Sequence, residues 1–175
     1  LKGLVYLIGI CLSYIVGILL KTLFWQLDGR RIGGKWSRKP FRINTPGMPG
    51  HTDAAMPDYC TVFEGPFHNS TLSAIATPSL NAIFHFFTFM YILLSVGTNP
   101  YKPPGGIAFV ILLGVVMITN LSFRYILMCD DFKSIAIGMI LGSLLGGVWF
   151  ALIKSTRPDW LFYGDEKQSK KYRCI

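Results

Sequence analysis

Residues 122–150 of the chain read SFRYILMCDDFKSIAIGMILGSLLGGVWF. An arginine stands near the start of this stretch, a short charged segment follows, and a long apolar run with recurring glycines completes it. Gly138, Gly142 and Gly146 lie four residues apart, so on a helix they would leave a flat strip that a second helix can approach closely. We expect this strip to serve packing within one helix bundle rather than to form a dedicated dimerisation face.

The composition around this stretch is that of a membrane protein. Of the 175 residues, 51% are hydrophobic and 15% are charged, and the mean hydropathy is +0.44. Soluble domains of this size rarely have such a balance. Four stretches approach or reach the ~20 apolar residues that a helix needs to cross a bilayer; they cover residues 3–20, 82–96, 105–123 and 135–153. The sequence therefore predicts an all-α membrane protein, a polytopic bundle of about four transmembrane helices, in which the last three spans form one compact unit.

The chain divides into four parts. We expect residues 1–25 to form a transmembrane helix, because the first apolar stretch lacks the small-residue cleavage site of a signal sequence. Residues 26–77 form a polar, basic loop, residues 78–154 form the core of the bundle, and residues 155–175 form a polar, lysine-rich tail. Because the chain does not begin with methionine, we also expect an upstream part, which can contain further spans.

The formal net charge of +8 does not indicate nucleic-acid binding. The basic residues stand between and after the apolar spans, where lysine and arginine ordinarily meet lipid headgroups. If the spans alternate in direction, the long loop and residues 124–133 share one side of the membrane. The two sides then carry equal numbers of lysine and arginine: Arg30, Arg31, Lys35, Arg38, Lys39, Arg42, Arg124 and Lys133 against Lys2, Lys102, Lys154, Arg157, Lys167, Lys170, Lys171 and Arg173. Charge alone therefore predicts no orientation.

The polar loop is the largest segment outside the spans. Loops of this length in a compact domain usually carry a function or bind a partner, so we expect protein partners to bind at residues 26–77. Asn69 begins an Asn-Ser-Thr sequon in this loop, and it would be glycosylated if the loop is lumenal or extracellular. The cysteines have no metal or redox spacing and predict no disulfide framework; they are Cys11, Cys60, Cys129 and Cys174.

Three short motifs follow one another along the chain. Lys35 and Arg42 are separated by six residues, and Ile43 comes next. Pro-Ser-Leu-Asn at residues 78–81 leads directly into the second apolar run, and Ser-Phe-Arg at residues 122–124 precedes the last one. In this order and at these places relative to the spans, the motifs resemble the three signature motifs of the type 2 phosphatidic acid phosphatase (PAP2) superfamily. The family forms are Lys, six residues, Arg-Pro; Pro-Ser-Gly-His; and Ser-Arg followed by a histidine and an aspartate.

The resemblance covers residues 35–150 and implies a PAP2-like bundle with a phosphate site. Phosphoryl transfer needs positive charge and hydrogen-bond donors around the phosphoryl oxygens, and a nucleophile in line with the leaving group. In the family, the basic residues of the first and third motifs and the serine of the second bind phosphate. The corresponding residues here, Lys35, Arg42, Ser79 and Arg124, would form the phosphate-binding cradle.

The reactive groups of the family have been replaced in this chain. Asp130 stands where the resemblance places the histidine nucleophile, Ser134 replaces the aspartate that orients this histidine, and Asn81 replaces the histidine that protonates the leaving oxygen. Asparagine cannot supply a proton near neutral pH, and serine cannot orient an imidazole that is absent. Asp130 and the adjacent Asp131 would also repel a phosphate. We therefore do not expect the reaction of the family.

Two histidines are candidate substitutes for the missing groups. His51 ends a Gly-Met-Pro-Gly-His segment that resembles a shortened second motif, but Pro57 follows closely and would break a membrane helix. His85 lies one helical turn after Asn81 and thus on the same face, although a hydrogen-bonded histidine inside a bundle is the simpler interpretation. An aspartyl nucleophile at Asp130 is less favoured because no divalent-ion site is evident. No metal or cofactor is expected, since the polar residues near these positions fit no metal spacing.

These observations favour a catalytically inactive, PAP2-like integral membrane protein. It would act as a structural or lipid-headgroup-binding subunit of a larger membrane assembly, such as an organellar complex or a viral membrane or capsid component. Its expected partners are membrane lipids, phosphorylated headgroups among them, and proteins bound through the polar loop. One alternative is an active lipid phosphate or isoprenyl diphosphate phosphatase with a rearranged site. A second alternative is an unrelated four-span scaffold whose motif matches are accidental.

Overall fold

The computed structural model describes residues 2–27, 77–99, 104–127 and 129–161. These residues form four α-helices and one short 3-10 helix, and no strand occurs among them. The helices are α1 (Lys2–Leu27), α4 (Leu80–Gly97), α5 (Pro104–Ile126), α6 (Phe132–Thr156) and the 3-10 helix η2 (Pro158–Trp160). All four α-helices are long and apolar enough to cross a membrane. The prediction of an all-helical, multi-pass membrane protein is therefore confirmed for the described residues.

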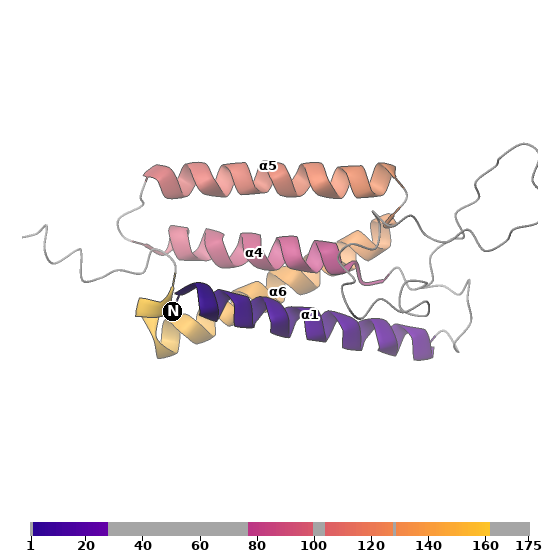
Figure 1. Cartoon of the computed structure of the whole chain (residues 1–175), viewed down its shortest axis with the longest axis horizontal. Helices are drawn as coiled ribbons and strands as arrows, with labels where there is room; N and C mark the ends of the chain where they lie inside the picture. The colour runs from indigo at the N-terminus through magenta and orange to yellow at the C-terminus, as the bar shows by residue number, and fades with distance from the viewer. Residues whose placement is uncertain (1, 28–76, 100–103, 128, 162–175) are drawn as a thin grey trace, which may run out of the picture.

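α4 is the central helix of the bundle (Figure 1). In the figure α5 and α1 lie on opposite sides of α4, and α6 crosses α4 obliquely; all three contact α4. Within the protein, 56% of the α4 span is buried, against 22% of the span of each other helix. Successive helices run in opposite directions, so the C-terminal ends of α1 and α5 lie at the same end of the bundle as the N-terminal ends of α4 and α6. This end is called the Asp130 end below, and the opposite end is called the η2 end.

The closest packing joins α6 to α4, and the glycine strip makes it. A Cβ atom at Gly138 would lie 2.7 Å from the carbonyl oxygen of Ser79, and one at Gly142 would lie 2.5 Å from that of Ile83. Gly146 faces α4 in the same way. These distances are too short for any side chain, so α6 lies directly on the backbone of α4. The strip serves packing within the bundle, as the four-residue spacing predicted.

α1 belongs to the same bundle, although the sequence predicted a compact unit of the last three spans only. It contacts both α4 and α6. A Cβ atom at Gly9 would come within 2.5 Å of the Trp149 ring and 2.7 Å of the Phe87 ring, so this glycine makes room for both aromatic side chains. The Tyr6 hydroxyl forms a hydrogen bond of 2.8 Å with the hydroxyl of Thr88 on α4. Apolar composition predicted the α1 span but not the neighbours of this helix.

The η2 end of the bundle is closed by an apolar cluster. Tyr91 of α4 and Phe150 of α6 meet there edge to face, with ring centroids 6.5 Å apart. Val5 of α1 packs into the same cluster. Leu161, directly after η2, is only 5% exposed because the chain turns back onto these helices. The segment after α6 therefore contributes to the core before the polar tail begins.

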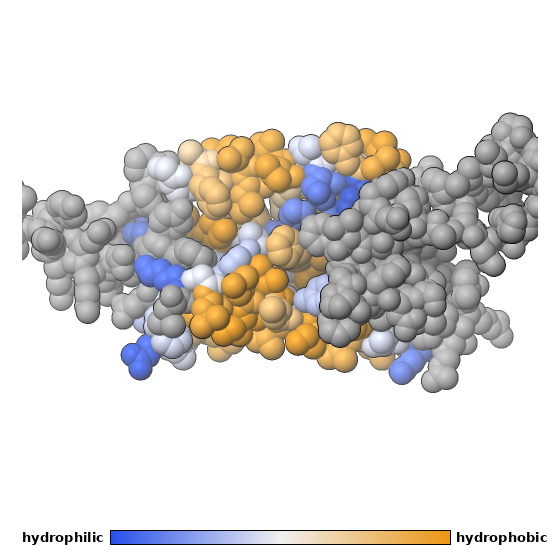
Figure 2. Space-filling view, viewed as in Figure 1, coloured by the Kyte–Doolittle hydropathy of each residue, from blue (hydrophilic) through white to orange (hydrophobic). Residues whose placement is uncertain are grey.

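The outer surface of the bundle suits a bilayer. Figure 2 shows a mainly apolar central part and polar residues nearer both ends of the described face. Large apolar side chains are exposed along α1, α5 and α6, for example Leu19, Ile111 and Leu144, which are each about 60% exposed. In water such a surface would be unfavourable, whereas in lipid it costs nothing.

The contact between α6 and α4 gives a direct test of this packing. We expect Gly142→Ala to lower the free energy of unfolding by about 1–3 kcal/mol, because the added methyl group must push α6 away from the α4 backbone. Gly147→Ala is the matched control, since nothing lies within 4 Å of its added methyl group. Unfolding of the purified protein in detergent measures both. Equal stability of the two variants would contradict this account of the interface.

Candidate functional site

The N-terminus of α4 supplies the first part of the site. Ser79 is the N-cap residue of this helix, and its hydroxyl accepts a hydrogen bond of 3.3 Å from the backbone N–H of Ala82. Capping by a serine oxygen satisfies one of the amide groups that a helix start leaves without a partner. Ser79 is 1% exposed. The serine of the Pro-Ser-Leu-Asn motif is thus buried at the Asp130 end of the bundle.

The turn between α5 and α6 brings a carboxylate to this serine. Asp130 accepts a hydrogen bond of 3.0 Å from the Ser79 hydroxyl at its Oδ2 atom. The same oxygen accepts a bond of 2.7 Å from Nε of Arg124, which lies in the last turn of α5. The side chains of Asp130 and Arg124 are 1% and 11% exposed. The arginine and the aspartate therefore form a buried ion pair to which Ser79 adds a third group; we call these three residues the carboxylate cluster.

The N-terminus of α6 is joined to the same place. Asp131 caps α6 and accepts hydrogen bonds at its Oδ1 atom from the backbone N–H of Ser134, at 3.2 Å, and from the Ser134 hydroxyl. The Ser134 hydroxyl also bonds with the Thr77 hydroxyl at 2.8 Å, and its carbonyl accepts a bond of 3.2 Å from the Ser79 amide. Ser134 is completely buried. It links the helix starts of α4 and α6 rather than orienting a reactive group.

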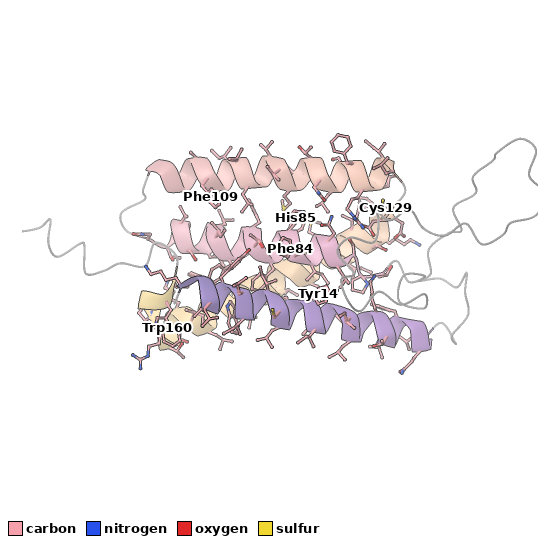
Figure 3. The ribbon with its side chains drawn as sticks, viewed as in Figure 1. Tyr14, Phe84, His85, Phe109, Cys129 and Trp160 are labelled. Carbon is pink, nitrogen blue, oxygen red and sulfur yellow. The ribbon has the colours of Figure 1, made fainter. Side chains whose placement is uncertain are left out.

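A second polar contact lies between α4 and α5. The Asn81 side-chain amide donates a hydrogen bond of 2.7 Å to the Asn120 side-chain oxygen. Asn81 is 1% exposed, and its own Oδ1 atom has no hydrogen-bond partner in the described part of the chain. His85 follows one turn later on α4 and also interacts with the side chain of Asn120. Figure 3 shows His85 between α4 and α5 and Cys129 at the Asp130 end.

The predicted site residues are thus partly brought together. Of the four phosphate-binding candidates, Ser79 and Arg124 meet, but they meet on the carboxylate of Asp130. The three residues at the positions where the resemblance would place reactive groups, Asn81, Asp130 and Ser134, all lie buried at the Asp130 end. Lys35, Arg42, His51 and Asn69 lie outside the described residues.

The chemistry open to the carboxylate cluster is limited. A phosphate bound by Arg124 and Ser79 would have to displace the Asp130 oxygen that both groups already contact. An anionic ligand would also be repelled by this carboxylate at short range. The observed arrangement therefore stabilises the join between α4, α5 and α6. Among the described residues, no group of three histidine, cysteine, aspartate or glutamate side chains could hold a metal ion.

Sequence reasoning missed three residues of the site. Asp131 was treated as a repulsive charge, but an aspartate directly before an apolar helical run is an N-cap signal that could have identified its role. Asn120 precedes Arg124 by four residues, so both lie on one face of α5, and this spacing could have marked Asn120 as a site residue. For Thr77, whose partner Ser134 is 57 residues away, no local signal exists.

Comparisons with known proteins add no relative. No family model matches the chain, and no curated protein or solved structure matches it.

The buried ion pair can be tested by a double-mutant cycle. We expect Asp130→Leu or Arg124→Leu to lower the free energy of unfolding by about 3–5 kcal/mol, because each leaves an uncompensated charge inside the bundle. The double variant should lose less than the two single losses together, since it leaves neither charge behind. Unfolding in detergent measures all three variants. Strictly additive losses would show that the two side chains do not stabilise one another.

Proposed function

We propose that the chain is a catalytically inactive, PAP2-like membrane protein that acts as a structural subunit of a larger membrane assembly. One observation carries this proposal. Asp130 stands at the position of the family's nucleophile. Its carboxylate oxygen accepts hydrogen bonds from both Arg124 and Ser79. This carboxylate oxygen occupies the place that a phosphate oxygen would need, so Asp130 itself occupies the expected anion site.

Electrostatics supports a structural role over headgroup binding. The attraction between Arg124 and Asp130 acts in a buried site, where screening by water is weak. An intramolecular carboxylate is also present at a high effective concentration, which a free phosphate or a lipid headgroup would have to exceed. A phosphorylated lipid would therefore gain little from Arg124 unless Asp130 moved away.

The arrangement of the replaced residues also argues against a rearranged phosphatase. A general acid or nucleophile must reach the substrate, and its proton must be free to move. Ser134 is fully buried and hydrogen bonded, and Asn81 is bonded to Asn120. Among the candidate substitutes, His85 lies in the second turn of α4 and interacts with Asn120.

The decisive assay is phosphate release by the purified full chain in detergent. We expect no turnover of phosphatidate or of an isoprenyl diphosphate, because the site lacks a nucleophile and an acid. Inactive wild-type protein that retains its helical circular dichroism would support the proposal. Turnover that His51→Ala or His85→Ala abolishes would overturn it and would favour a phosphatase with a rearranged site.

Ligand binding tests, without an activity assay, whether Asp130 occupies the expected anion site. We expect dioctanoyl phosphatidate to bind the wild-type chain no more tightly than dioctanoyl phosphatidylcholine. Asp130→Asn should bind phosphatidate at least about tenfold more tightly, a difference of about 1.4 kcal/mol, because Arg124 loses its anionic partner. The matched control is Asp131→Asn, which makes the same charge change, keeps a good N-cap residue and leaves Arg124 paired. Tight wild-type binding unaffected by Asp130→Asn would instead indicate a headgroup-binding subunit.

A further inference from the structure

We propose that the Asp130 end of the bundle faces an oxidising compartment, lumenal or extracellular, and that the η2 end faces the cytosol. This assignment fixes the orientation that the charges leave open, since lysine and arginine are equally numerous on the two sides. It does not depend on the proposed function, because it rests on a different residue.

The evidence for this orientation is a disulfide at Cys129. It follows α5, immediately before Asp130, and its sulfur is in a disulfide. The residue is 1% exposed. Its backbone N–H donates a hydrogen bond of 2.9 Å to the carbonyl of Arg124, and the next amide contacts the same carbonyl. The disulfide is therefore attached to the turn that presents the Asp130 carboxylate to Arg124 and Ser79.

The proposed orientation also identifies the second cysteine of this disulfide. Cys11 lies within α1 and is a free thiol. The chain has four cysteines. Cys174 follows η2, which this orientation places on the opposite side of the membrane from Cys129, so the proposal requires Cys60 of the polar loop as the partner. A bond between Cys129 and Cys174 would contradict the assignment, because both residues would then share one side of the membrane.

The presence of this disulfide indicates which side of the membrane Cys129 faces. Disulfides form and persist in secretory and extracellular compartments, whereas cytosolic thiols are kept reduced. The ends of α1 and α4 that flank the long polar loop lie at the same end of the bundle as Cys129 (Figure 1). The loop, with the Asn69 sequon, therefore enters the oxidising compartment, and the segment after η2 stays on the other side.

Thiol trapping under denaturing conditions tests the oxidation state. Membranes from a eukaryotic host that expresses the full chain are dissolved in denaturant with an excess of an alkylating reagent, so that the buried Cys129 is accessible, and are then reduced and labelled with a mass tag. We expect Cys129 to acquire the tag only after reduction, and the tag to be lost in Cys129→Ser. Cys60→Ser should make Cys129 alkylatable without reduction, whereas Cys174→Ser should leave Cys129 oxidised; the opposite result would overturn the proposal. A wild-type Cys129 that is alkylated before reduction would overturn the proposal.

Glycan acceptors at the two ends test the orientation without any thiol. Asn69 is the acceptor at the Asp130 end, and Asn69→Gln is its control. At the η2 end, Lys167→Asn creates an Asn-Gln-Ser sequon with Gln168 and Ser169. We expect a glycosidase-sensitive shift from Asn69 and none from the Lys167→Asn acceptor. A glycan at position 167 would overturn the proposal; if neither acceptor is modified, the oxidation state of Cys129 decides.

Discussion

The direct contact between the backbones of α6 and α4 is the constraint on which the rest of the bundle depends. Gly142 and Gly146 let the two helices touch in the middle of the membrane, and Gly138 continues the contact to the carbonyl of Ser79. Because the helices meet at this distance, the Ser79 amide can bond with the carbonyl of Ser134. The same glycine strip that holds the apolar part of the bundle together therefore also positions its polar end. In lipid, where apolar burial between helices gives little driving force, such close van der Waals contact is the main source of association.

At the Asp130 end, close helix packing buries polar groups that need partners. Three helix ends meet there, and their free amide groups and the Arg124 charge are removed from water. An unpaired buried charge would cost several kcal/mol, and each unsatisfied amide would cost about 1–3 kcal/mol. Asp130 neutralises the arginine, while the hydroxyl of Ser79 and the carboxylate of Asp131 cap their own helices. These contacts meet the requirements of helix packing at the polar end of the bundle.

The sequence predicted the spans well because hydrophobicity and length are local properties. Each predicted apolar stretch lies inside one observed helix, and the glycine spacing predicted the α6 contact face. The neighbours of α1 could not be predicted, because Gly9 is needed only to make room for Trp149 and Phe87, which lie in other helices. At the site, the motifs predicted that Ser79 and Arg124 would converge, but not that Asp130 would lie between them. The order of residues along a chain identifies candidates for an anion site, whereas only the folded geometry shows which anion fills it.

Three polar residues, at the positions where the PAP2 resemblance would place reactive groups, each have a partner within the bundle. Asp130 pairs with Arg124, Ser134 bonds with Thr77 and Asp131, and Asn81 bonds with Asn120. A reactive site must keep its nucleophile and its acid accessible, so those groups cannot be fully used in bonds within the protein. Here each of the three side chains forms a hydrogen bond with a neighbouring helix or turn. The side chains of Asp130, Ser134 and Asn81 thus join α4, α5 and α6 at this end of the bundle.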